Sequence, residues 1–212
     1  MTVLITGTSR GIGAGLAAAY AARGDEVIGT TRDGEWPLDV TDSADHAALA
    51  TQLKGRPIDL LVCNAGVYLD KAERLENGFA PSLWAETFAA NVTGVFLTVQ
   101  NLLPNLKAAQ AARIAIISST MASSTRAPGG SYIYRASKAA VLNLGRNLAA
   151  DLEHQGIAVG IYHPGWVVTD MGGAGADISI DAAVSGLVAR FDDLSIASTG
   201  VFETWDGRPH AY

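Results

Sequence analysis

Short apolar runs alternate with longer helix-type segments along the whole chain. Most of these runs are continuous rather than strictly alternating, which is typical of parallel strands buried on both faces of a sheet. They predict six strands: Thr2–Thr6, Glu26–Thr30, Ile58–Val62, Arg113–Ile117, Ile157–Tyr162 and Thr199–Phe202. The longer segments predict helices, of which the clearest are Ala14–Ala22, Ser43–Leu53, Pro81–Ala109 and Tyr132–His154.

Glycine, proline and capping residues mark the ends of these helices. Gly24 is a stop signal after the first helix, and Asp42 lies among polar residues that can cap the second. Pro81 suits the first turn of the third helix, whereas Pro104 inside it predicts a bend or break. The alternation of strands and helices, joined by right-handed crossovers, predicts an α/β fold. We expect a Rossmann-type, doubly wound parallel sheet with helices on both faces.

The composition suits one compactly packed domain. Of the 212 residues, 49% are hydrophobic and 17% are charged, and no internal repeat or low-complexity linker divides the chain. We therefore expect a single domain over residues 1–212. The formal net charge is -6 and Lys and Arg form no long run, which disfavours binding to nucleic acid or to an anionic membrane. No window approaches the roughly 18 consecutive apolar residues of a membrane span.

The only cysteine, Cys63, lies at the end of the apolar run Leu60–Cys63, where a buried thiol is expected. A lone cysteine cannot form a disulfide within the chain, which favours a reducing environment. The N-terminus enters the first strand directly and lacks the basic and apolar regions of a signal peptide. These features predict a cytoplasmic protein.

A glycine-rich turn follows the first strand and leads directly into an Ala-rich helix. Glycines at such a turn allow the backbone to approach a phosphate closely, and the helix N-terminus offers free N–H groups. The spacing is Gly-x-x-x-Gly-x-Gly rather than the general Gly-x-Gly-x-x-Gly, in the run Gly7, Thr8, Ser9, Arg10, Gly11, Ile12 and Gly13. This turn predicts a dinucleotide site, and the alternative is a turn whose glycines serve packing alone.

The residues after the second strand bear on the choice of cofactor. NAD(H) sites usually place an acidic residue here to hold the ribose 2′-hydroxyl, but this chain has Thr31 and Arg32. Arg32 can pair with a 2′-phosphate, with Arg10 as a second cation, so NADP(H) is favoured over NAD(H). Two alternatives stay open: both arginines are solvated surface charges, or a shift of the strand end brings Asp33 to the ribose.

A serine, a tyrosine and a lysine form a candidate catalytic set. Tyr134 and Lys138 are four residues apart on a predicted helix and so share one face. Ser118 and Ser119 follow a predicted strand, at the same sheet edge as the glycine turn. A nearby ammonium lowers the pKa of a tyrosine, which suits Tyr134 to acid/base chemistry. The alternative for the pair is an exposed amphipathic helix face; Tyr132 is the local competitor, but Ala136 follows it at the lysine spacing.

Together these motifs resemble the short-chain dehydrogenase/reductase family, over nearly the whole chain. In family order, the matching residues are Gly7-x-x-x-Gly11-x-Gly13, Asn64-Ala65-Gly66, Asn91, Ser119, Tyr134-x-x-x-Lys138 and Pro164-Gly165. Within the family, the runs around Tyr134–Lys138 and His163–Gly173 are similar to the small carbonyl reductases that include the sniffer and C-factor proteins.

The resemblance implies specific catalytic roles. Tyr134 would give its proton to a carbonyl oxygen as hydride arrives from the nicotinamide, and reclaim it in the reverse reaction. Lys138 would hold the nicotinamide ribose and lower the pKa of Tyr134. Ser119 would hydrogen-bond the substrate oxygen as negative charge develops, and Asn91 would position a water that links Lys138 to solvent.

The resemblance also implies where the cofactor lies. Asp39 and Val40 would border the adenine, and Asn64, Ala65 and Gly66 would line the cofactor cleft. Around the nicotinamide amide it implies Pro164, Gly165, Val167 and Thr169. The chain departs from the usual family pattern in two places. Ser119 lies fifteen residues before Tyr134, slightly farther than usual, so Ser118 stays an alternative, and the segment before Asp39 is short.

These features predict an NADP(H)-dependent oxidoreductase that acts on a small carbonyl or alcohol. The alternatives are an NADP(H)-binding sensor or signalling protein without turnover and, disfavoured by the short chain, a sugar epimerase or dehydratase. No His or Cys cluster suggests a metal site. The short glycine-rich segment Met171–Asp177 predicts a mobile substrate lid. The family resemblance suggests a homodimer or homotetramer that packs through Pro81–Ala109 and Tyr132–His154.

Overall fold

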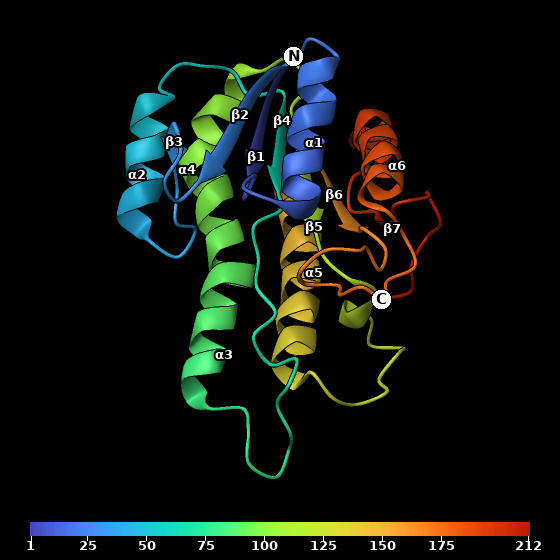
Figure 1. Ribbon diagram of the computed structural model, residues 1–212. Helices are drawn as coiled ribbons and strands as arrows, with labels where there is room; N and C mark the ends of the chain where they lie inside the picture. Colours follow the sequence, from blue (N-terminus) through green and yellow to red (C-terminus); the bar gives the residue numbers. More distant parts are fainter.

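The computed structural model describes residues 1–212 and contains one seven-stranded sheet (Figure 1). All neighbouring strands are parallel, in the order β3-β2-β1-β4-β5-β6-β7. The strands are β1 Thr2–Thr6, β2 Glu26–Thr31, β3 Trp36–Pro37, β4 Leu60–Cys63, β5 Arg113–Ile117, β6 Ala158–His163 and β7 Phe202–Thr204. The chain reverses direction across the sheet between β1 and β4, where ligands of open α/β sheets bind.

Helices cover both faces of the sheet, which confirms the predicted doubly wound fold (Figure 1). The helices are α1 Gly11–Ala22, α2 Ser43–Gln52, α3 Pro81–Phe88, α4 Gly94–Ala108, α5 Tyr132–Glu153 and α6 Ile180–Asp193. Side chains alternate along β1, so Leu4 joins the core beneath α2, α4 and α5, while Val3 and Ile5 join the core beneath α1 and α6. Two cores on opposite sides of the sheet result.

The predicted helix Pro81–Ala109 is two helices, and the expected break at Pro104 is wrong. A π-helical turn, η1 Ala89–Thr93, joins α3 to α4, and α4 continues through Pro104 to Ala108. Proline has no N–H, so Pro104 cannot donate to the carbonyl of Gln100 one turn earlier. Both residues are exposed, and water can bond to that carbonyl instead. The irregular turn lies instead at Asn91, whose side chain is bonded to other elements.

Other differences from the predicted boundaries are small. A short strand at Trp36–Pro37 was not predicted, and it adds an edge to the sheet. The last strand is Phe202–Thr204 rather than Thr199–Phe202, because Gly200 adopts a left-handed φ of 85° that ends any extended run before it. Cys63 is buried as expected, and burial raises its thiol pKa to about 12. None of the helices is long and apolar enough to span a bilayer.

Candidate active site

The glycine turn between β1 and α1 is shaped for close approach by a ligand. Gly7 and Gly11 have positive φ values of 73° and 59°. A Cβ added to Gly13 would lie 2.1 Å from the Gly7 carbonyl oxygen, so only glycine fits there. Arg10 precedes α1 but makes no side-chain capping bond, and the first turn carries no acidic residue. The N–H groups of Gly7 and Thr8 donate to the Thr30 carbonyl, whereas those of the first turn of α1 are uncapped and can bind an anion such as a pyrophosphate.

The segment after β4 is bonded to the glycine turn. Asn64 Nδ2 donates to the carbonyls of Thr6 and Gly7 at 3.0 and 3.1 Å, and the backbone N–H groups of Asn64 and Ala65 both donate to Thr6 Oγ1 at 3.0 Å. Asn64 thus holds the turn in shape through its side chain. β1 and β4 are neighbouring parallel strands, so the predicted cleft residues Asn64, Ala65 and Gly66 lie at the same carboxyl edge of the sheet as the glycine turn.

The adenine side is only partly organised by side chains. β2 ends at Thr31, one residue later than predicted, so Arg32 follows it directly and Asp33 comes next; both are exposed.

Asp39 accepts hydrogen bonds from Thr41 N and Oγ1 at 2.9 and 2.7 Å, and these bonds hold its carboxyl pKa below the usual value. The carbonyl of Val40 accepts from His46 Nε2. Asp39 and Val40 therefore form a fixed wall, while Arg32 is free to pair.

Arg10, the predicted second cation, is already paired. Its guanidinium forms an exposed ion pair with Asp170, from the loop after β6. Nearby, Thr169 Cγ2 would lie 3.6 Å from a Cβ on Gly11. The loop after β6 therefore reaches across to the glycine turn. Arg10 must leave Asp170 before it can join Arg32 at a 2′-phosphate.

The loop after β6 is folded back on itself. Gly165 has a φ of 91°, and a Cβ there would lie 2.3 Å from Ile178 Cδ1. Val167 forms an isolated parallel bridge with Ile178. Thr169 Oγ1 accepts from Gly172 N at 3.0 Å, and Pro164 follows β6 directly. Pro164, Gly165, Val167 and Thr169 thus lie on one loop beside the glycine turn, as a cofactor cleft requires.

Ser119, Tyr134 and Lys138 meet at the carboxyl edge of the sheet. All three are buried, with exposed fractions of 8%, 7% and 6%. Lys138 Nζ donates to the Ile117 carbonyl at 3.0 Å and lies 5.6 Å from the centroid of the Tyr134 ring. Burial lowers the Lys138 pKa to about 8.

The environment of Tyr134 raises its pKa above the ordinary value. Burial is the main cause, the neighbouring Tyr68 and Asp70 act in the same direction, and the Ser119 hydroxyl acts in the opposite one. The lowering expected from Lys138 does not outweigh burial in this structure, where its ammonium donates to the Ile117 carbonyl and lies 5.6 Å from the Tyr134 ring centroid. Tyr134 is therefore protonated at neutral pH and suited to donate a proton.

The structure distinguishes the alternatives within this set. Ser118 Oγ donates to the Lys138 carbonyl and points into the protein, whereas Ser119 Oγ accepts from Met121 N at 3.1 Å and its hydroxyl faces the Tyr134 phenol, whose pKa it lowers. Tyr132 is 39% exposed and packs edge-on against Phe79. The geometry favours Ser119 over Ser118.

Asn91 connects the π turn to the catalytic helix. Its Nδ2 donates to the Val67 carbonyl and to Ser137 Oγ, at 2.9 and 3.0 Å, and its Oδ1 accepts from Val67 N. A Cβ on Gly66 would lie 2.9 Å from Asn91 Oδ1 and 3.7 Å from Lys138 Nζ. Asn91, Gly66 and Lys138 therefore converge, although no direct bond joins Asn91 to Lys138.

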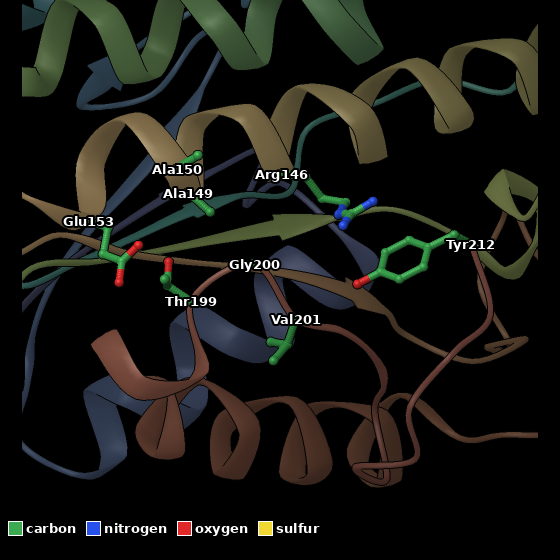
Figure 2. Close-up of a pocket in the computed structure, with 8 residues that line it drawn as sticks. All are labelled: Arg146, Ala149, Ala150, Glu153, Thr199, Gly200, Val201 and Tyr212. Atoms are coloured by element: carbon green, nitrogen blue, oxygen red, sulfur yellow. The ribbon is translucent and has the colours of Figure 1, made fainter.

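Two hollows lie near α5. One, of about 470 Å³, begins at the residues after Ser119 and is lined by Thr120, Met121, Arg126, Ala127, Pro128 and Arg135. Figure 2 shows the other, of about 440 Å³, lined by Arg146, Ala149, Ala150, Glu153, Thr199, Gly200, Val201 and Tyr212. Since Arg146 lies about 18 Å along the helix from Tyr134, the second hollow is separate from the catalytic set. No group of three or more His, Cys, Asp or Glu side chains is arranged to hold a metal.

Sequence reasoning missed two residues that contact Tyr134. The ring of Tyr68 stacks on that of Tyr134, with centroids 4.2 Å apart, and the carboxylate of Asp70 accepts from the Tyr134 backbone N–H. Both lie in an irregular segment without periodicity. The only available signal was their position shortly after Asn64-Ala65-Gly66, at the ligand-binding edge of the sheet.

Several known proteins are similar to this chain in sequence. The family model described as short chain dehydrogenase matches residues 1–177. The C-signal protein of Myxococcus xanthus is 34% identical over 76% of this chain and 96% of its own length. A 1-hydroxy-2-glutathionyl-2-methyl-3-butene dehydrogenase of Rhodococcus sp. (strain AD45) is 32% identical over 97% of each chain.

Solved structures are similar over the whole chain. The NADPH-bound carbonyl reductase from chicken fatty liver superposes with a TM-score of 0.91 and 31% identity, covering 100% of this chain and 98% of that one. The carbonyl reductase Sniffer of D. melanogaster gives a TM-score of 0.92 with 27% identity, over 100% and 99%. Sequence, fold and site agree, and the chain belongs to the short-chain dehydrogenase/reductase family of oxidoreductases.

Proposed function

We propose that this protein is an NADP(H)-dependent oxidoreductase that transfers hydride between the nicotinamide and a small carbonyl or alcohol, with Tyr134 as general acid/base. The observation that carries the proposal is the convergence of Ser119, Tyr134 and Lys138 at the sheet edge where the uncapped N-terminus of α1 follows the glycine turn. Similar solved structures include NADPH-bound and NADP-bound proteins, which supports the choice of cofactor.

The residues of the chain fit this cofactor. The free N–H groups at the start of α1 would hold the pyrophosphate, and exposed Arg32 would pair with the 2′-phosphate. The loop that carries Pro164 and Thr169 would cover the nicotinamide end. When bound, NADPH supplies the hydride.

The catalytic residues then handle the carbonyl oxygen and its proton. Ser119, whose hydroxyl faces the Tyr134 phenol, donates a hydrogen bond to the oxygen as negative charge develops. Tyr134 donates its proton to the same oxygen. Lys138 has two N–H groups beyond the one bonded to Ile117, enough to hold the ribose hydroxyls.

The test is NADPH oxidation by the purified protein against a panel of small aldehydes and ketones. We expect saturable turnover with several panel members and a lower KM for NADPH than for NADH. Tight NADPH binding without turnover on any carbonyl or alcohol would favour the rival function, an NADP(H)-binding sensor. The sensor is disfavoured because binding alone requires no buried serine, tyrosine and lysine around one point.

We further propose a homodimer or homotetramer that forms through α3, α4 and α5. Trp84 on α3 and Phe96 on α4 are 37% and 40% exposed, which leaves large apolar side chains on this face. Sedimentation velocity should show a dimer or tetramer that dissociates in Phe96→Glu. A monomer at all working concentrations would reject this part of the proposal. The single buried thiol suits a reducing, cytoplasmic location, where we place the protein.

A further inference from the structure

A buried carboxylate caps the helix that carries Tyr134. Asp70, in the segment after β4, is 1% exposed. Its Oδ2 accepts from Ile133 N at 2.8 Å and its Oδ1 accepts from Tyr134 N at 3.2 Å. No ion pair with Lys, Arg or His accompanies these bonds. Burying a carboxylate in this way is costly unless the N–H groups at the helix N-terminus compensate for its lost hydration.

The sequence of α5 provides no cap of its own. Ser131, the residue before the helix, is held at a left-handed φ of 48° and makes no side-chain capping bond. Its hydroxyl instead contacts the phenol of Tyr68. The first turn of α5 is therefore satisfied by a side chain 63 and 64 positions away in sequence, which ties it to the segment after β4.

The same segment also holds the Tyr134 side chain. The ring of Tyr68 stacks on the Tyr134 ring, with centroids 4.2 Å apart and planes 20° apart. Asp70 thus fixes the backbone of Tyr134 while Tyr68, two residues earlier, covers one face of its ring. Neither residue is hydrogen-bonded to the Lys138 ammonium, which donates to the Ile117 carbonyl.

We infer that Asp70 is a positioning residue for proton transfer: its carboxylate holds the first turn of α5 so that the Tyr134 phenol stays aligned with Ser119 and Lys138. This inference rests on the proposed function. Near-attack geometry is sensitive to displacements of about 1 Å, which can cost roughly 100-fold in rate. A carboxylate that anchors the backbone N–H of the proton donor itself is well placed to prevent such a displacement.

The charge of Asp70 has a second consequence. The titratable groups that face Tyr134 are Lys138 on its own helix and Tyr68 and Asp70 from the segment after β4, and the Ser119 hydroxyl faces it from beyond β5. Burial raises the Tyr134 pKa most, and Tyr68 and Asp70 raise it further. Reduction needs a protonated phenol, so its rate is lost as pH rises through this pKa. Removing the Asp70 charge lowers the pKa and moves the alkaline limb to lower pH.

The test compares Asp70→Asn and Asp70→Glu with a matched control, Asp42→Asn. Asp42 is exposed and caps α2 through Ala44 N at 2.8 Å, so its variant loses a capping carboxylate away from Tyr134. For each protein we would measure kcat, KM for a panel carbonyl, the Kd for NADPH, the Tm and the pH profile of kcat.

We expect Asp70→Asn to lower kcat roughly 10- to 100-fold with an unchanged Kd for NADPH. The alkaline limb of its pH profile should move to lower pH, since the Asp70 charge raises the Tyr134 pKa. Asp70→Glu should keep the wild-type limb, and Asp42→Asn should keep kcat. The inference is overturned if Asp70→Asn has the same kcat and the same alkaline limb as wild type. It is also overturned if the loss of kcat is fully explained by the fraction of the protein that is unfolded.

Hydrogen–deuterium exchange keeps this test separate from that of the proposed function. If wild type shows no turnover on any substrate, the proposed function fails and the exchange of the peptide that contains Ile133 and Tyr134 tests the anchoring. Faster exchange there in Asp70→Asn, with the rest of the protein unchanged, would support Asp70 as the anchor of Tyr134. Equal exchange would reject it.

Discussion

The Lys138 ammonium donates a hydrogen bond to the Ile117 carbonyl, 3.0 Å away, and so joins the catalytic helix α5 to the last residue of β5. Ser118 and Ser119 follow Ile117 directly, and Ser118 Oγ returns a hydrogen bond to the Lys138 carbonyl at 3.2 Å. Two bonds of opposite direction therefore hold the strand that leads to Ser119 against the helix that carries Tyr134. The spacing of the proton donor and the oxygen-binding hydroxyl is set by this joint.

Replacing Lys138 with Met should change how stability depends on pH. Burial lowers the Lys138 pKa to about 8 from an ordinary value of 10.5, so above pH 8 the unfolded chain binds more protons than the folded one. Wild type should therefore gain stability relative to Lys138→Met as pH rises from 7 to 9.5. The pKa values of Tyr20, Tyr134 and Tyr162 are raised by burial in both proteins. Their contributions to the pH dependence of stability therefore cancel in the comparison.

The measurement is the Tm of both cofactor-free proteins at pH 7 and pH 9.5. A Tm difference that does not change with pH would show that Lys138 is not desolvated as described. Turnover should be lost in Lys138→Met at either pH, since the ribose loses its ammonium donor.

The stack of Tyr68 on Tyr134 predicts a contrast between two substitutions. Tyr68→Phe keeps the ring and loses only the contact with the Ser131 hydroxyl, so kcat should stay within about threefold of wild type. Tyr68→Ala uncovers one face of Tyr134 and removes a half-buried ring, which should cost about 1–3 kcal/mol of unfolding free energy and lower kcat more than KM. Steady-state kinetics and urea denaturation measure both effects. Equal kcat values in the two variants would show that the stack does not orient Tyr134.

Arg32 should set the preference for NADPH. Its guanidinium is exposed just after β2 and has no ion-pair partner, so it can meet a 2′-phosphate without first losing another bond. Arg32→Ala should raise the Kd for NADPH roughly 10- to 100-fold, the loss expected for one or two charged hydrogen bonds, and change the Kd for NADH little. Lys54→Ala, which removes another exposed cation, is the control. Tight NADH binding by wild type with no preference for NADPH would contradict the role of Arg32.

Much of the fold could be predicted because the strands are continuous apolar runs. β1 and β5 have the predicted bounds, since Val, Leu, Ile and Ala occupy Val3–Ile5 and Ile114–Ile117 without a break. Parallel strands bring their carboxyl ends to one edge, so the meeting of the glycine turn, Ser119 and the start of α5 follows from the order of elements. The helix spacing of Tyr134 and Lys138 then places both on one face.

The remaining features depend on contacts between distant segments. The π turn at Asn91 is fixed by hydrogen bonds to Val67 and Ser137, which cannot be predicted from the local sequence. Pro104 predicts a break from the local sequence, but it lies on the exposed face of α4 and the helix continues through it. The pairing of Arg10 with Asp170 joins positions 160 residues apart. Asp70 likewise acts on a helix that begins far along the chain. Irregular segments carry no periodicity, so their side-chain directions cannot be inferred from sequence.

The most direct test of the account is the rate of NADPH oxidation by Tyr134→Phe beside wild type, together with the Kd for NADPH of each. Phe keeps the stack with Tyr68 and removes only the phenol oxygen, so the fold and cofactor binding should be preserved. We predict that kcat falls by at least about 100-fold, the lower end of the range for loss of a general acid, while the Kd for NADPH changes less than about threefold. Turnover by Tyr134→Phe at the wild-type rate would contradict the assignment of Tyr134 as the proton donor, and with it the central claim.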